Sequence, residues 1–374
     1  MNTQDRQCSI TRGPLSDNGI SSNAGSNPSG SPRLSRRDFV KTSAAAAVLL
    51  AGMPALAAPP STDPKFIWGA LLHMGTNMWS DIPVKGWGSF KPDELHLVCA
   101  ADHLRFDQAV WNTLTERMQT AHMNMVVIDL GEALKYKSHP ELSVKGSWPI
   151  DKFRAELTRL RAMGLEPIPK LNFSTAHDTW LKDYGRQVST PTYYRVCSDM
   201  IREVCEIFDR PRFFHLGYDE ETAAHQTQYS YATVRQGELW WHDFLFFVKE
   251  VESQGVRPWI WSDYYWNHPE EFLKRMPKSV LQSNWYYGAT FEPEKQKYVQ
   301  AYIDLDKAGF DQVPTGSNWS SDVNFKGTVE FCKQKLSPEH LKGFLMAPWF
   351  FTLKEWQGKN LQAIAQVEEM IRAK

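Results

Sequence analysis

The sequence has few cysteines, and their spacing matches no known metal-binding or disulfide pattern. The 374 residues include five cysteines, at Cys8, Cys99, Cys197, Cys205 and Cys332. None belongs to a C-x-x-C pair, and the spacings suit neither a zinc site nor a small disulfide-rich domain. We therefore expect the four cysteines after Cys8 to be mostly buried thiols.

The chain also lacks an excess of charge of either sign. Lys and Arg number 42 and Asp and Glu number 43, so the formal net charge is -1 at pH 7. Nucleic-acid-binding domains and electrostatic membrane anchors carry clusters of positive charge that attract phosphate. The composition therefore predicts neither a nucleic-acid partner nor a membrane anchor of that kind.

The first part of the chain has no pattern of a packed fold. Residues 1–34 are rich in Ser, Asn and Gly and show no hydrophobic period, which predicts disorder. Ser35-Arg36-Arg37-Asp38-Phe39-Val40-Lys41 follows, then an apolar stretch over 44–56 and the small-residue site Ala55-Leu56-Ala57. Paired arginines before a short apolar stretch resemble a twin-arginine export signal, which is read by the export machinery.

A membrane-anchoring helix over 42–58 is the alternative for this segment. It is disfavoured because the stretch is short and rich in Ala and contains Gly52 and Pro54. We predict that residues 1–57 are a leader with a cleavable signal and that residues 58–374 form one domain. The mature protein is then expected in the periplasm or outside a bacterial cell.

From Lys65 onward, short apolar runs alternate with amphipathic stretches. The expected strands are 66–74, 123–130, 166–172, 212–218, 257–264, 280–286, 312–317 and 344–350. The expected helices are 104–122, 151–163, 190–208, 236–254, 269–276, 294–308, 324–334 and 357–372. This alternation predicts an α/β fold, a (β/α)8 TIM barrel. An open doubly wound sheet is the alternative, but no glycine-rich phosphate loop follows the first strand.

Active sites of such barrels lie at the carboxyl ends of the strands. These positions collect carboxylates, imidazoles, amides and aromatic rings: His73, Asp129, Glu132, Asn172, His177, Asp219, Glu220, Trp261, Asp263, Trp285, Tyr286, Asn318, Trp319, Asp322 and Trp349. Carboxylates and amides suit sugar hydroxyls, and flat rings suit the C–H faces of a sugar. The chain has 15 Trp, and this rim predicts a carbohydrate site.

The run His215-Leu216-Gly217-Tyr218-Asp219-Glu220-Glu221 places adjacent carboxylates where the expected fourth strand ends. Glycoside hydrolysis needs an acid that protonates the leaving oxygen and a second group that supports positive charge at the sugar carbon. A bare Asp-Glu pair is more often a solvated turn. The barrel pattern and the aromatic rim favour a catalytic role for Asp219 and Glu220.

This run resembles the H-x-G-G-D-E signature of family 20 glycoside hydrolases, the β-N-acetylhexosaminidases. Further segments resemble that family in the same order: Lys137-Ser138-His139-Pro140-Glu141-Leu142, Pro169-Lys170-Leu171-Asn172 with His177, Trp259-Ile260-Trp261-Ser262-Asp263, and Ser317-Asn318-Trp319-Ser320-Ser321-Asp322. The resemblance extends over 123–349, and only the first motif is specific by itself.

The resemblance implies a substrate-assisted retaining mechanism, in which the 2-acetamido oxygen of the substrate attacks C1. Asp219 would orient the acetamido group, and Glu220 would protonate the leaving oxygen. This role requires a raised pKa of Glu220, toward which an ionised Asp219 would contribute. His177 would bond to Glu220 with Asp129 behind it as a relay, and Glu132 competes with Asp129 for that position.

The remaining roles implied by the resemblance concern support and substrate binding. His215 would support the fourth strand from within. Trp261, Trp285 and Trp349 would wall the pocket, and further substrate contacts are expected from Asp263, Tyr286, Trp319 and Asp322.

The chain departs from the family where the sugar is recognised. The family's Arg after the first strand is missing from Leu71-Leu72-His73-Met74-Gly75, and its last Glu is missing after Trp349. These losses leave two alternatives open: a non-catalytic carbohydrate-binding protein, and a retaining glycosidase in which Asp263 is the nucleophile. A metal-dependent hydrolase is disfavoured because His73 has no H-x-H partner. We expect an amino-sugar glycan as substrate, and no metal or cofactor.

Overall fold

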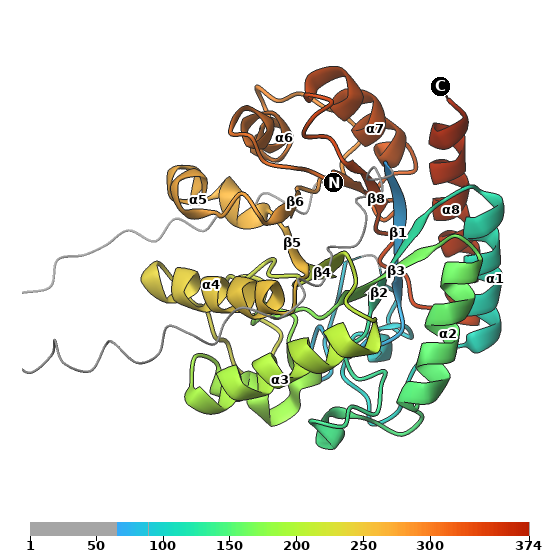
Figure 1. Ribbon diagram of the computed structural model, residues 1–374, viewed down its shortest axis with the longest axis vertical. Helices are drawn as coiled ribbons and strands as arrows, with labels where there is room; N and C mark the ends of the chain where they lie inside the picture. Colours follow the sequence, from blue (N-terminus) through green and yellow to red (C-terminus); the bar gives the residue numbers. More distant parts are fainter. Residues whose placement is uncertain (1–65, 89, 374) are drawn as a thin grey trace, which may run out of the picture. The chain divides into compact units, whose positions relative to one another are not determined.

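The computed structural model describes residues 66–88 and 90–373, which form a parallel barrel surrounded by helices (Figure 1). The strands are β1 Ile67–His73, β2 Met125–Asp129, β3 Glu166–Lys170, β4 Phe213–His215, β5 Arg257–Trp261, β6 Leu281–Ser283, β7 Thr315–Gly316 and β8 Gly343–Met346. They pair in the order β6-β5-β4-β3-β2-β1-β8-β7. Isolated bridges from Gln282 to Gln312 and from Trp285 to Thr315 join the two end strands. The predicted (β/α)8 barrel is confirmed.

Each strand is followed by a helix that packs on the outside of the barrel (Figure 1). The helices are α1 Gln108–Thr120, α2 Ile150–Ala162, α3 Pro191–Ile207, α4 Glu238–Ser253, α5 Pro269–Arg275, α6 Lys297–Lys307, α7 Asn324–Lys335 and α8 Gln357–Arg372. Thr190 caps α3 by accepting from the Tyr193 N–H, and Pro191 takes the first helical position. α2 begins at Ile150, one residue before the expected start, so Asp151 lies in its first turn.

The register of the strands aligns polar residues at one level of the barrel. His73 pairs with Asp129, Asp129 pairs with Lys170, and Lys170 pairs with His215. Below this level the interior is apolar, with residues such as Leu71 and Val127 fully buried. Because side chains alternate between the two faces of a strand, this row shares the inward face with the apolar residues two positions earlier. The row therefore forms the floor of the barrel mouth.

The expectation of mostly buried thiols is confirmed for the described residues. Cys197, Cys205 and Cys332 are buried, Cys99 is half-buried, and all four are free thiols. Trp240 and Trp241 of α4 are buried packing residues. No helix within 66–88 and 90–373 is both long and apolar enough to cross a bilayer. The leader and export signal expected over 1–57 lie outside the described residues and stay predictions.

Candidate active site at the carboxyl ends of the strands

The turn after β4 brings the carboxylate pair to the barrel mouth through an unusual backbone. Gly217, Tyr218 and Glu220 have positive φ angles of 67°, 74° and 56°. A Cβ at Gly217 would lie 2.2 Å from the Asn172 side chain, so only glycine fits there. Left-handed backbone at Tyr218 and Glu220 is strained and persists only where surrounding contacts hold it, as is common at functional sites.

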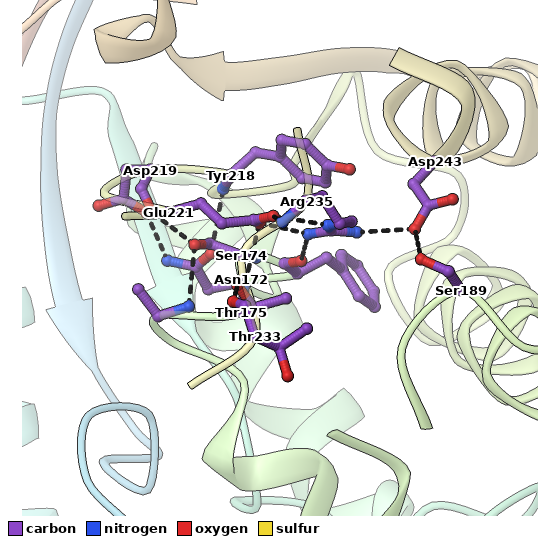
Figure 2. A network of polar contacts seen from close by, with 12 residues as sticks. Asn172, Ser174, Thr175, Ser189, Tyr218, Asp219, Glu221, Thr233, Arg235 and Asp243 are labelled. Atoms are coloured by element: carbon purple, nitrogen blue, oxygen red, sulfur yellow. Dashed lines mark hydrogen bonds and ion pairs between the residues drawn. The ribbon is translucent and has the colours of Figure 1, made fainter. Parts of the chain in front are cut away.

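Asn172, just after β3, supplies several of those contacts (Figure 2). Its side-chain oxygen accepts from the Tyr218 N–H and the Ser174 N–H, each at 3.0 Å. Its amide donates to Asp219 Oδ1 at 2.7 Å. Asp219 Oδ2 faces His177 Nε2 at 3.5 Å. One oxygen of Asp219 is thus held by Asn172, and the other points into the group of ionisable side chains.

Two histidines flank Glu220. His177 Nε2 lies 3.3 Å from Glu220 Oε2, as the sequence predicts, and His225 Nε2 lies 3.4 Å from Oε1. Burial raises the pKa of Glu220, but the two histidines outweigh burial and bring this pKa below its ordinary value. Burial lowers the pKa of His177 and of His225, and the neighbouring carboxylates outweigh it, so both pKa values are raised.

The expected raised pKa of Glu220 is therefore wrong, because His225 adds a second cationic partner that sequence analysis missed. The carboxyl group in contact with the Glu220 turn whose pKa is raised is Asp263. Burial, followed by the charge of Asp219, raises the pKa of Asp263 to about 7. Asp263 Oδ2 accepts from the Glu220 N–H at 2.9 Å, so Asp263 also holds the strained turn.

The expected relay through Asp129 is also corrected. Asp129 Oδ2 accepts from the fully buried Lys170 ammonium at 2.8 Å and lies 3.3 Å from His73 Nδ1. Glu132 takes no relay position either, because its carboxylate accepts from the Thr76 and Asn77 N–H groups. Asp129 is therefore paired by charge with Lys170 and lies beside His73, and no contact among the described residues joins it to His177.

His215 lies beneath the pair and is buried. Its Nδ1 accepts from the Gly217 N–H at 3.0 Å, and its ring packs 4.3 Å from that of Trp261. Burial, followed by the charge of Lys170, brings the pKa of His215 well below its ordinary value, which fits a neutral imidazole that accepts this bond. This position agrees with the expected supporting role.

Aromatic rings line the mouth of the barrel, and one of them is not the residue that the sequence predicts. The ring of Trp349 lies 5.7 Å from Trp261, and Trp285 stacks on Tyr287 at 5.0 Å. The Trp349 indole N–H donates to the Tyr287 hydroxyl at 2.8 Å. Tyr286, the expected contact, packs instead on Phe291. Neighbouring residues after a strand point to opposite sides, so Tyr287 rather than Tyr286 joins the wall.

Two of the expected substrate contacts lie elsewhere on the rim. Trp319 packs against Phe90 and Phe350, with ring centroids 5.7 and 5.3 Å apart. Asp322 is exposed to solvent. Within the described residues neither side chain contacts Asp219 or Glu220, because the segment after β7 turns toward the loop that follows β1.

The third acidic residue of the motif, Glu221, turns away from the site and anchors its loop (Figure 2). Its carboxylate accepts from Arg235 Nε at 2.8 Å and from Nη2 at 2.6 Å. Arg235 Nη1 also donates to Asp243 of α4 at 3.2 Å, and its guanidinium lies 4.6 Å above the Tyr218 ring. This buried ion network fixes the strained turn to the helix behind it. No periodic pattern in the sequence marks it.

One cluster among the described residues has the ligand types of a metal centre. Suitable ligand atoms of His177, Asp219 and Glu220 all lie within 4.8 Å of one another. The same atoms make the histidine–carboxylate contacts described above. The cluster can thus be read as a proton-sharing group or as a cation site, and removal of metal distinguishes the two.

The sequence matches no family model and no curated protein. Solved structures do match. A β-N-acetylhexosaminidase from Bacteroides fragilis is 11% identical, with 80% of this chain and 66% of that chain covered and a TM-score of 0.53. A mutant Streptomyces plicatus β-hexosaminidase in complex with its product GlcNAc is 14% identical, with coverage of 82% and 64% and a TM-score of 0.51. The chain thus spans about two thirds of these structures, and the likeness is one of fold.

Proposed function

We propose that the protein is an exported glycoside hydrolase that cleaves β-linked N-acetylhexosamine by a substrate-assisted retaining mechanism. The observation that carries the proposal is the placement of Asp219 and Glu220, side by side at the end of β4 and both facing His177. The likeness in fold to β-N-acetylhexosaminidases supports the same chemistry. The paired arginines and apolar stretch before residue 57 support export.

Asp219 has the geometry for the acetamido group. Its Oδ1 is occupied by the Asn172 amide, so Oδ2 is the oxygen available to accept the acetamido N–H. Held in this way, the acetamido oxygen attacks C1 as the glycosidic bond breaks, and the carboxylate supports the positive charge of the oxazolinium ion that forms.

Glu220 delivers the proton that the leaving oxygen needs. His177 contacts Glu220 from the buried side, and its raised pKa favours a proton on the imidazole in contact with this carboxylate. The proton passes from the imidazole to Glu220 and from Glu220 to the glycosidic oxygen. In the second half of the reaction Glu220 takes a proton from water, and the hydroxide formed attacks C1 and opens the oxazolinium ring.

The route with a protein nucleophile has less support. Asp263 is the nearest further carboxyl group, and its pKa of about 7 keeps much of it protonated near neutral pH. A protonated carboxyl group is a poor nucleophile. Its Oδ2 is also engaged with the Glu220 N–H.

The test is hydrolysis of four aryl β-glycosides by the purified protein: N-acetylglucosaminide, N-acetylgalactosaminide, glucoside and galactoside. Asp219→Asn and Glu220→Gln are compared with Asp322→Asn, whose side chain is exposed on the same rim. We expect cleavage of an acetamido substrate only, losses of at least about 100-fold in the first two variants and no loss in the third. A thiazoline analogue of the oxazolinium ion should inhibit.

The other outcomes identify the alternatives. Cleavage of plain glucoside or galactoside would indicate a protein nucleophile, and Asp263→Asn would then abolish it. No cleavage of any of the four, together with glycan binding that survives in Glu220→Gln, would indicate a carbohydrate-binding protein.

A further inference from the structure

The two oxygens of Glu220 face different surroundings. Oε2 contacts His177, whose side chain is 7% exposed, whereas Oε1 contacts His225, whose side chain is 46% exposed. A departing sugar leaves toward solvent, so the oxygen on the solvent side is the one that meets the glycosidic oxygen. His225 therefore stands on the side from which the leaving group departs.

The His225 ring is held in place by its own turn. Thr222 Oγ1 lies 2.7 Å from His225 Nδ1, and the same oxygen accepts from the His225 N–H at 3.3 Å. With Nδ1 engaged by this hydroxyl, Nε2 is the ring atom left to bind a partner. That partner is Glu220.

The loop that carries His225 is fixed to the loop that carries His177. The next residue, Gln226, is 3% exposed, and its amide donates to the Thr233 carbonyl at 2.8 Å and to Thr175 Oγ1 at 3.3 Å. Tyr229 donates its hydroxyl proton to the Ala176 carbonyl at 2.6 Å. A side chain on a loop anchored in this way keeps its position while substrate enters.

We propose that His225 binds the departing sugar: the glycosidic oxygen approaches Glu220 Oε1, and His225 Nε2, held beside that oxygen, hydrogen-bonds a hydroxyl of the leaving group. The inference rests on the proposed function and adds a residue that recognises the leaving group. Because Nε2 lies 3.4 Å from Oε1, a sugar hydroxyl adjacent to the glycosidic oxygen comes within its reach. The natural substrate would then carry a sugar, rather than an apolar group, on the leaving side.

The experiment compares two leaving groups on one glycone. The glycone is the N-acetylhexosamine that the wild type releases, carried on 4-nitrophenol and on a second identical sugar in a β-linked disaccharide. Since the glycone is the same, effects on its binding cancel in the ratio of the two kcat/KM values. His225→Ala and His225→Gln are compared with His103→Ala, an exposed histidine paired only with Asp102.

In His225→Ala we expect kcat/KM for the disaccharide to fall by about 10- to 100-fold, the effect of one lost hydrogen bond to a sugar hydroxyl. The 4-nitrophenyl substrate should lose less than about threefold, because its leaving group offers no hydroxyl and needs little help from an acid. His225→Gln, which keeps a hydrogen-bond donor, should recover part of the loss, and His103→Ala should change neither substrate.

Equal losses for both substrates, or no loss for either, would overturn the assignment of His225 while leaving the proposed function standing. A wild type that cleaves the aryl glycoside and not the disaccharide would overturn it too. A wild type inactive on both substrates would instead remove the proposed function, and the assignment with it.

Discussion

Trp349 donates its indole N–H to the hydroxyl of Tyr287 at 2.8 Å, across the aromatic wall of the barrel mouth. The phenol oxygen is thus an acceptor in this bond, and its own proton remains available to a ligand. Trp349 itself has a left-handed φ of 60°. Because strained backbone is common at functional sites, we expect this hydroxyl to contact a ligand.

Replacement of this donor tests the contact. In Tyr287→Phe we expect kcat/KM on an acetamido glycoside to fall by about 10- to 100-fold, because a hydrogen-bond donor of the aromatic wall is lost. Tyr286→Phe is the matched control, because that ring packs on Phe291 away from the site. The measurement is kcat/KM of both variants on one aryl glycoside. Equal behaviour of the two variants would remove Tyr287 from the site.

The raised pKa of Asp263 makes the stability of the protein depend on pH. The pKa rises from 3.8 to about 7 on folding. Between these values the folded state keeps a proton that the unfolded state has lost, so this group lowers the free energy of unfolding as pH rises. Asp263→Asn cannot ionise and should gain about 1 kcal/mol or more over wild type across this window.

Urea denaturation of the two proteins at about pH 4.5 and about pH 7.5 measures this gain. The difference in free energy of unfolding between Asp263→Asn and wild type should be larger at the higher pH. Asp322→Asn removes an exposed carboxylate, so its free energy of unfolding should equal that of wild type at both pH values. A difference that does not change with pH would show that Asp263 keeps its ordinary pKa.

The ion network of Arg235 predicts a large loss of stability on truncation. Arg235→Met would leave Glu221 and Asp243, both at most 3% exposed in their side chains, without their cationic partner. We expect a loss of about 3–5 kcal/mol, because the charges stay buried. Arg212→Met, which breaks the more exposed pair with Glu166, should cost about 1 kcal/mol or less. Denaturant unfolding of both variants provides the comparison.

The buried pair of Lys170 and Asp129 should behave as a coupled unit. Lys170→Met alone strands the Asp129 carboxylate in the barrel interior and should cost about 3–5 kcal/mol. Adding Asp129→Leu removes the stranded charge, so the double variant should be more stable than the single one. A double variant whose loss equals the sum of two large single losses would contradict this coupling.

Removal of metal separates two interpretations of His177, Asp219 and Glu220. If these atoms share protons, as we propose, prolonged treatment with EDTA should leave hydrolysis unchanged within about twofold. If they hold a cation, activity should vanish and return on addition of zinc. The wild type on the best aryl glycoside is the sample to measure.

The barrel follows from the sequence because eight continuously apolar runs alternate with amphipathic stretches. The runs overestimate some strands: 312–317 is expected where β7 covers only Thr315–Gly316. Apolar character continues wherever the chain is buried, whereas a strand requires a paired neighbour, and β7 meets β6 only through isolated bridges. Burial is therefore easier to predict than pairing.

Site residues at strand ends could be found because topology alone brings them to one rim. Asp219, Glu220, His177 and Asp263 gather in this way. His225 could not be found, because it lies in a loop whose conformation follows no periodic pattern. Because the prediction left out His225, it also gave the wrong direction for the pKa shift of Glu220. The expected wall residue Tyr286 was likewise wrong by one position, because Tyr287 lies in the wall instead.

The barrel closes between β6 and β7 through isolated bridges, and the aromatic wall residues Trp285 and Tyr287 follow β6 at this place. The carboxylates follow β4, whose loop is tied to α4 by Arg235. A change of spacing at the β6–β7 junction would then move the aromatic wall while the carboxylates keep their positions. Tolerance for sugars of different bulk would reside at that junction, and substitutions there should change which glycan is accepted without changing how its bond is broken.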